Sequence, residues 1–164
     1  ELKNDYADAY FNRGVAKQAR GDSAGAIADY DRAIETKRDW AEAYNNRGSA
    51  KHARGDLAGA IADFDRAIEF KKDHAKAYFN RGNARVALTD LAGAIADYDR
   101  AIELKKDFAE AYHNRAAVKQ ARGDLAGAIA DYERSLAVAP ANWPLRRTAE
   151  QNLERLRRER DDKR

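Results

Sequence analysis

The sequence predicts an all-α fold, a solenoid of antiparallel helix hairpins. Three observations predict it. Tyrosine recurs every 34 residues within closely similar segments, each segment carries apolar residues at helical spacing, and a short glycine-containing break divides most segments in two. Because one hairpin cannot bury its own apolar face, neighbouring units must stack on one another. The repeated tyrosines are Tyr10, Tyr44, Tyr78 and Tyr112, and the four complete units are 7–40, 41–74, 75–108 and 109–142.

The first helix of each unit is expected to follow an aspartate, because an Asp-x-x-Glu pattern is typical of a capping box. Asp39 and Glu42 show this pattern in the second unit, and Asp107 and Glu110 show it in the fourth. Small residues such as Gly48 allow the two helices of a hairpin to approach closely, while the aromatic residues fill the remaining space.

The second helix of each unit is expected to begin after a Gly-Asp pair such as Gly55 and Asp56. Glycine tolerates the left-handed conformation that ends a helix, and aspartate caps the next one. Gly59, in the first turn, is expected to permit close helix contact, at a cost of about 1 kcal/mol relative to alanine. One apolar stripe follows on this helix, formed by Leu57, Ile61, Phe64 and Ile68.

The junctions between units leave two alternatives. Arg38, Lys72 and Lys106 allow the second helix to run on into the next unit, because none of them is proline. We prefer the alternative, a short turn with solvated lysines, because an aspartate follows each junction.

The two ends of the array differ from its body. Residues 1–6 resemble residues 103–108, so we expect them to be the remnant of a preceding unit in a fragment or an engineered, consensus-like array. Residues 143–164 predict a C-terminal capping helix with a frayed charged tail. The apolar face of this helix is formed by Leu145, Ala149, Leu153 and Leu156.

Composition excludes several classes of protein. The chain of 164 residues has no cysteine and no methionine, so it has neither a disulfide framework nor a thiolate metal site. No apolar run is long enough to span a membrane, and no leader resembles a signal peptide, which leaves the cytoplasm as the default localisation. The net charge of +3 comes from residues 145–164, with 8 basic and 5 acidic side chains. The balanced body argues against a broad nucleic-acid surface.

Residues 7–142 resemble the tetratricopeptide repeat family. The leading aromatic of that family falls on Tyr10 and its equivalents, its glycine falls on Gly14, Gly48 and Gly82, and its later alanine, aromatic and alanine fall on Ala26, Tyr30 and Ala33. The resemblance implies a right-handed superhelical solenoid whose first helices line a concave surface that holds peptides.

The chain departs from that family at two positions of every first helix. Arginine stands where leucine is usual, at Arg13, Arg47, Arg81 and Arg115, and a basic residue stands where tyrosine is usual, at Lys17, Lys51, Arg85 and Lys119. We expect the aliphatic stems of these residues to cover the apolar layer. We expect their charges to pair with Asp29, Asp63, Asp97 and Asp131.

The predicted site is the concave surface. An asparagine ladder in superhelical members of the family implies that Asn12, Asn46, Asn80 and Asn114 bind the backbone of an extended peptide, because an amide both donates and accepts. The alternative is that these amides bond within or between helices. The other expected groove residues are Phe11, Val15, Asn45, Ser49, Lys76, Phe79, Asn83 and His113.

We therefore expect a non-catalytic interaction scaffold that binds an extended protein or peptide segment, with no cofactor, metal site or catalytic residue. His52, His74 and His113 fall in different units, without the short spacing of metal ligands. A chaperone-tail clamp is disfavoured because Phe11 and Val15 replace its first lysine and asparagine. The alternative function is a homo-oligomer that stacks end to end through its uncapped N-terminal edge. A third reading, nucleic-acid binding through the tail, is weakened by its five acids.

Overall fold

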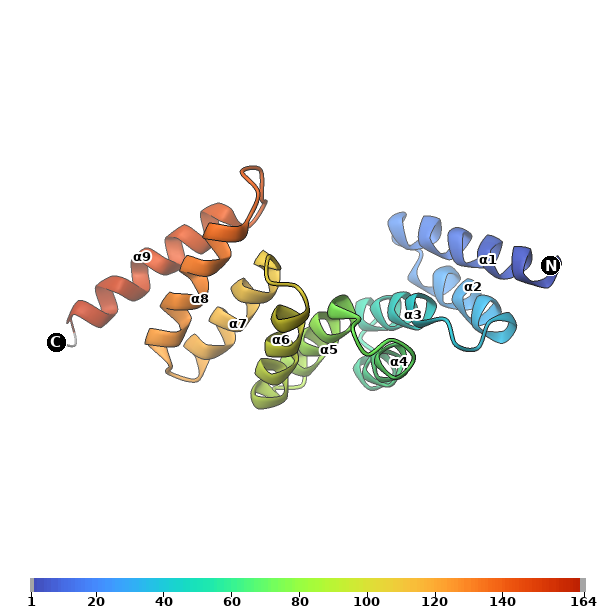
Figure 1. The fold of residues 1–164 in the computed structure, drawn as a ribbon, viewed down its shortest axis with the longest axis horizontal. Coiled ribbons are helices and arrows are strands. Elements are labelled where there is room, and N and C mark those ends of the chain that lie inside the picture. The colour runs from blue at the N-terminus through green and yellow to red at the C-terminus, as the bar shows by residue number, and fades with distance from the viewer. Residues whose placement is uncertain (1, 163–164) are drawn as a thin grey trace.

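The computed structural model describes residues 2–162, with side chains from Tyr6 onward. Over this range the chain forms nine helices and no strand. Figure 1 shows the helices following one another along an elongated, curved array with the two termini at opposite ends. The helices are α1 (Leu2–Ala19), α2 (Ser23–Thr36), α3 (Ala41–Ala53), α4 (Leu57–Phe70), α5 (Ala75–Ala87), α6 (Leu91–Leu104), α7 (Ala109–Ala121), α8 (Leu125–Val138) and α9 (Arg146–Asp162).

Each hairpin closes around one aromatic ring of its second helix. Tyr30, Phe64, Tyr98 and Tyr132 are almost completely buried. In the second unit, a Cβ on Gly48 would lie only 2.8 Å from Cε1 of Phe64, so glycine is needed for the helices to approach this closely. The same ring also packs against Ala84 of the next unit. One aromatic residue therefore holds both a hairpin and a junction together.

The junctions between units are short turns, as preferred from the sequence. α2, α4 and α6 end before Lys37, Lys71 and Lys105, and four residues separate each of them from the next helix. In the first unit, by contrast, residues 2–6 continue α1. The fused long helix is therefore not formed between α2 and α3, α4 and α5, or α6 and α7.

The predicted capping boxes are wrong. Trp40 and Phe108 occupy the N-cap positions of α3 and α7, and neither helix has a side-chain cap. The aspartates stand one residue too early in the turn to reach the helix. The glutamates bind elsewhere: Lys71 donates to Glu42 at 3.1 Å, and Trp143 Nε1 donates to Glu110 at 3.2 Å.

Aspartate does cap the second helices, as predicted. In α4, the amide N–H of Gly59 donates to Oδ1 of Asp56 at 2.9 Å. The reason for Gly59 itself is different from the one we expected. A Cβ there would lie 2.2 Å from Oδ2 of Asp56, so glycine makes room for the capping carboxylate and not for a neighbouring helix.

Helix α9 packs on α8 in the way that the first helix of a further unit would. Asn152 donates to the hydroxyl of Tyr132 at 3.2 Å, and Arg157 donates to Glu133 at 2.7 Å. Ala149, Leu153 and Leu156 are buried against α8, which confirms the predicted apolar face. The helix runs to Asp162, through most of the segment predicted to fray, and residues 163–164 lie outside the described residues. None of the helices within residues 2–162 is long and apolar enough to cross a membrane.

Candidate functional site

The first helices lie on the inner side of the array. α1, α3 and α5 each contact the next first helix, which is α3, α5 and α7 respectively, and all four first helices contact their own partner in the hairpin. On this inner side, most of the twelve predicted groove residues keep part of their surface. Asn12, Val15 and Lys76 are exposed, whereas Phe11, Asn46, Ser49, Phe79, Asn80, Asn83 and Asn114 are half-buried.

Asn45 and His113 are a correction to the predicted site, because their side chains are buried, with only 3% and 9% of their surface exposed. They occupy the position that directly precedes the ladder asparagine. At this position the side chain turns toward the segment that leads into the next unit, where the ring of His113 meets Trp143 at 5.6 Å. These two residues support the groove from beneath and do not offer their side chains to a ligand.

Phe11 and Phe79 occupy the same position in the first and third units. Phe11 stacks on Trp40 with ring centroids 4.4 Å apart, and Phe79 lies 4.8 Å from Phe108. Each ring also packs against a cluster that contains residues of the next unit, Tyr44 for Phe11 and Tyr112 for Phe79. Both rings are only half-buried, so each joins two units while it leaves part of its surface exposed.

Two asparagines of the predicted ladder, Asn80 and Asn114, make hydrogen bonds between units, whereas Asn46 accepts from Asn45 of its own helix. Asn80 Nδ2 donates to Oδ1 of Asn45 at 2.9 Å and to Oγ of Ser49 at 3.3 Å. Asn114 Nδ2 donates to Oδ1 of Asn83 at 2.8 Å. The alternative interpretation, in which these amides bond within or between helices, is therefore confirmed for their amino groups. Their remaining polar atoms lie on the half-exposed inner side.

The buried tyrosines of the second helices take part in the same network, which the sequence analysis missed. The Tyr98 hydroxyl donates to Oδ1 of Asn83 at 2.7 Å, and the Tyr30 hydroxyl donates to Gln18 at 2.8 Å. Burial raises the pKa of Tyr30 to about 12. Phe64 has no hydroxyl, and a small depression of about 120 Å³ lies beside it. The sequence signal for this network was the tyrosine that three of the four units carry at this position, where the second unit has phenylalanine.

A larger depression of about 320 Å³ lies between α5, α6 and α7. Its walls are mainly apolar, and Asn83, Tyr98 and Asn114 supply its polar groups. Asn83 and Asn114 were predicted to face the groove, but Val86 and Val118 were not. A comparison of corresponding positions in the four units could have found them. The remaining lining residues are Leu91, Ala117 and Ala121.

The repeated arginines pair with aspartates, as predicted. Arg47 donates to both carboxylate oxygens of Asp63, at 2.8 and 2.5 Å, and Lys51 lies 2.8 Å from the same carboxylate. In the first unit the hydrogen bond from Arg13 lowers the pKa of Asp29 to about 2, although burial acts in the opposite direction. The Asp29 carboxylate is therefore charged at neutral pH, and Arg13 and Lys17 neutralise it. Within residues 2–162, no cluster of histidine and acidic residues could hold a metal ion.

The same arginines also connect neighbouring units, which was not predicted. Arg47 donates to Asp31 of the preceding unit at 2.6 Å, and Arg81 donates to Asp65 at 2.5 Å. Arg115 makes the equivalent bond to Asp99. Each arginine thus bridges two second helices.

The N-terminal edge presents an apolar surface. Tyr6, with 62% of its surface exposed, lines a depression of about 300 Å³ together with Ala9, Tyr10 and Arg13. In the second unit the equivalent of Tyr10, Tyr44, packs in one cluster with Ile34 of the preceding second helix.

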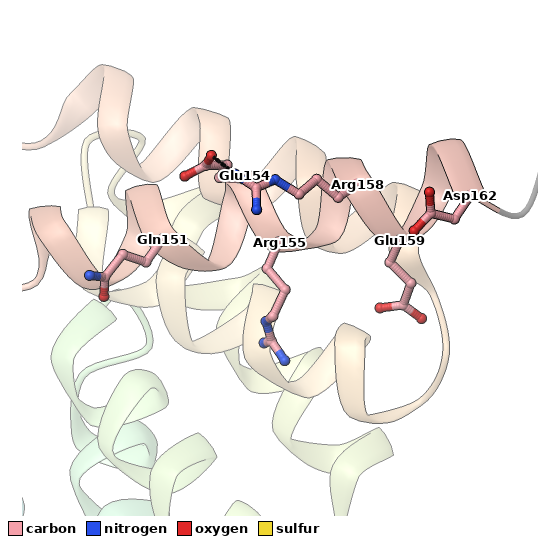
Figure 2. A pocket seen from close by; sticks show the side chains of 6 residues that line it. All are labelled: Gln151, Glu154, Arg155, Arg158, Glu159 and Asp162. Carbon is pink, nitrogen blue, oxygen red and sulfur yellow. Dashed lines mark hydrogen bonds and ion pairs between the residues drawn. The ribbon is translucent and has the colours of Figure 1, made fainter.

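The face of α9 that points away from the array is charged. Figure 2 shows the six side chains that line a depression of about 510 Å³ on this helix. Glu154 and Arg158 form an ion pair one turn apart. Acidic and basic side chains are mixed on this face, which argues against a site for the phosphates of a nucleic acid. The six residues are Gln151, Glu154, Arg155, Arg158, Glu159 and Asp162.

Comparisons with protein-family models cover most of the chain. A model described as "TPR repeat" matches residues 48–88 and 82–121, and models described as "Tetratricopeptide repeat" match residues 7–39 and 108–139. No curated protein sequence matches the chain at a significant level.

Solved structures give the same result for the fold. MamA protein is similar with a TM-score of 0.78 and 25% identity, over 92% of this chain and 80% of that chain. The first TPR of Spaghetti (RPAP3), bound to the HSP90 peptide SRMEEVD, is similar with a TM-score of 0.71 and 28% identity, over 73% and 95%. The Arabidopsis OM64 TPR domain, at 24% identity and a TM-score of 0.71 over 72% and 98%, shows the fold alone.

Proposed function

Because the chain belongs to the tetratricopeptide repeat family, whose members are typically non-enzymatic interaction scaffolds, we propose that it binds an extended peptide along the inner side of its first helices. The observation that carries the proposal is the row of half-exposed amides at Asn46, Asn80 and Asn114. A similar domain, the first TPR of RPAP3, is bound to a peptide in its solved structure.

The chemistry of this row suits a peptide backbone. An asparagine side chain offers one carbonyl acceptor and two amide donors. Asn80 and Asn114 each use their amino group for a bond inside the array, so their carbonyl groups are left for the N–H groups of a ligand. Backbone recognition of this kind does not read the sequence of the ligand. Selectivity must come from the surrounding side chains.

The groove does not suit the acidic tail of a chaperone. Asn46 and Lys76 match the expected clamp, but Phe11, Val15 and Asn80 replace its remaining lysine, asparagine and arginine. A carboxylate bound here would lack the paired cations that usually hold one. We therefore propose a ligand that is neutral or mildly polar, and we expect the peptide SRMEEVD to bind weakly or not at all.

The test is a screen of immobilised extended peptides, followed by titration of the best peptide in solution. Replacing Asn46 and Asn80 by alanine is expected to weaken binding about tenfold or more, because two backbone contacts are lost. Replacing Glu69 by alanine is the matched control, because Glu69 is exposed on α4, a second helix. Unchanged affinity of the double variant, with circular dichroism unchanged, would contradict the proposed site.

A second candidate function is self-association through the N-terminal edge, which the exposed Tyr6 and the depression beside it favour. Helix α9 covers the opposite edge, so one copy cannot stack its α1 on the α8 of another. Two N-terminal edges can still meet, which gives a closed dimer and no filament. Light scattering over a range of concentrations tests this, and Tyr6→Lys is expected to abolish any dimer and leave peptide binding unchanged.

A further inference from the structure

The third unit departs from the repeat at the end of its first helix. Val86 stands where the other units have glutamine or histidine, and Leu88 stands where all the others have arginine. In the fourth unit, Val118 stands where the others have alanine. The corresponding residues of the other units are Gln18, His52 and Gln120, then Arg20, Arg54 and Arg122, and then Ala16, Ala50 and Ala84.

The hairpin forms in other units without these apolar residues, although Val118 is itself buried against Ala94 and Tyr98. The other units form the same hairpin with polar or smaller side chains at the same positions, and their helices end at equivalent places. Leu88 is 50% exposed, so it gains little from packing. A change toward apolar residues at one junction, in an array of near copies, therefore indicates a local requirement other than folding.

The structure brings two of these residues together. Val86 and Val118 line the depression of about 320 Å³ between α5, α6 and α7, and Leu91 adds a third large apolar wall. Figure 1 shows these three helices side by side in the C-terminal half of the array. None of the eight lining residues is charged. A charged ligand side chain would lose its hydration here without gaining a partner.

The polar groups of the depression lie where a peptide backbone needs them. Oδ1 of Asn83 accepts from Tyr98 and from Asn114. These bonds use the carbonyl of Asn83 and the amino group of Asn114. The amino group of Asn83 and the carbonyl of Asn114 remain, and they complement the C=O and N–H of a peptide. The bond from Tyr98 also fixes the orientation of Asn83.

We propose that this depression is a specificity pocket for one large apolar side chain of the ligand, such as leucine, methionine or phenylalanine, with Asn83 and Asn114 binding the adjacent backbone. The inference rests on the proposed function, because it assigns a subsite within the same groove. It identifies the ligand as an extended, uncharged segment with one apolar anchor residue, whose side chain lies between the third and fourth units.

The experiment uses labelled peptides with a background of serine, threonine and asparagine and a single scanned position that is leucine, phenylalanine, alanine or aspartate. The wild-type chain is expected to bind the leucine peptide about tenfold more tightly than the alanine peptide, and the aspartate peptide least. The variant V86Q/V118A introduces only residues that other units already carry at these positions, and circular dichroism checks its fold because Val118 is buried. It is expected to bind the leucine and alanine peptides equally.

The outcomes separate this inference from the proposed function. If peptides bind without preference for an apolar residue, or if V86Q/V118A keeps the preference, the pocket is refuted while groove binding stands. If no peptide binds, the proposed function fails and the pocket fails with it. If V86Q/V118A abolishes self-association and no peptide competes with it, the occupant is a second copy of the chain, and the assignment to a peptide ligand is overturned.

Discussion

Thr89 lies in a turn with a strained backbone conformation, and a substitution by glycine can relieve the strain. Thr89 has a φ of 61°, whereas Gly21, Gly55 and Gly123 occupy the same position with φ values of 81–82°. A β-branched residue in this left-handed region costs about 1–2 kcal/mol. The bond from its hydroxyl to the carbonyl of Leu88, at 2.6 Å, recovers part of that cost. Thr89→Gly is therefore expected to stabilise the chain.

The net gain follows from two opposing terms. Glycine removes the steric strain, but it adds about 0.5–1 kcal/mol of conformational entropy to the unfolded chain. Because the hydroxyl bond reduces the strain to about 1–1.5 kcal/mol, the difference leaves a net stabilisation of about 0.5 kcal/mol. With a urea m-value of about 2 kcal/mol/M, the unfolding midpoint is expected to rise by about 0.2–0.3 M at an unchanged slope.

The chain contains its own control for this prediction. Gly55→Thr introduces the same residue into a turn that is relaxed in the wild-type chain, with no atom within 4 Å of the new Cβ. It is expected to lower the urea midpoint by a similar amount, because only the backbone conformation differs. Far-UV circular dichroism measures both variants. A midpoint that does not rise for Thr89→Gly, while Gly55→Thr has no effect, would refute the argument from strain.

Three further predictions use the same urea assay. Tyr98→Phe is expected to destabilise the chain by about 1 kcal/mol because Asn83 loses a buried donor, and an unchanged midpoint would contradict the role given to this bond. Asp29 has a folded pKa near 2 against an ordinary value of 3.8, so its stabilisation is present above pH 4 and lost as the pH falls toward 2. Asp29→Asn is expected to make unfolding less acid-sensitive over that range, and equal acid sensitivity would oppose it. Gly48→Ala is expected to cost about 1–2 kcal/mol because its Cβ would meet Phe64, and an unchanged midpoint would contradict the need for glycine there.

The candidate site was predictable in outline but not in its details. The spacing of Asn46, Asn80 and Asn114 placed all three on the inner side, because positions separated by one repeat occupy equivalent places in a solenoid. Asn45 and His113 were misplaced because contacts with other units bury them: Asn45 accepts from Asn80, and the ring of His113 packs on Trp143. The pattern of one helix does not show such contacts, and Phe11 and Phe79 at the same position stay half-exposed.

The start of α3 shows a second limit of prediction from the sequence. Asp39 and Glu42 have the spacing of a capping box, but the turn places Trp40 at the N-cap. The ring of Trp40 packs on Phe11 of α1, so a tertiary contact holds the residue that directly precedes α3. A local pattern predicts a cap only when no tertiary contact competes for the same residues.

The sequence by itself determined the repeat, the two helices of each unit, the aspartate caps of the second helices and the pairing of Arg47 with Asp63, because each of these depends on spacing along one or two adjacent helices. Only the tertiary structure decided that Arg47 also reaches Asp31, that Tyr98 orients Asn83 and that Val86 and Val118 form one depression. These contacts join different units. Their geometry depends on how one hairpin is placed against the next, which no single repeat encodes.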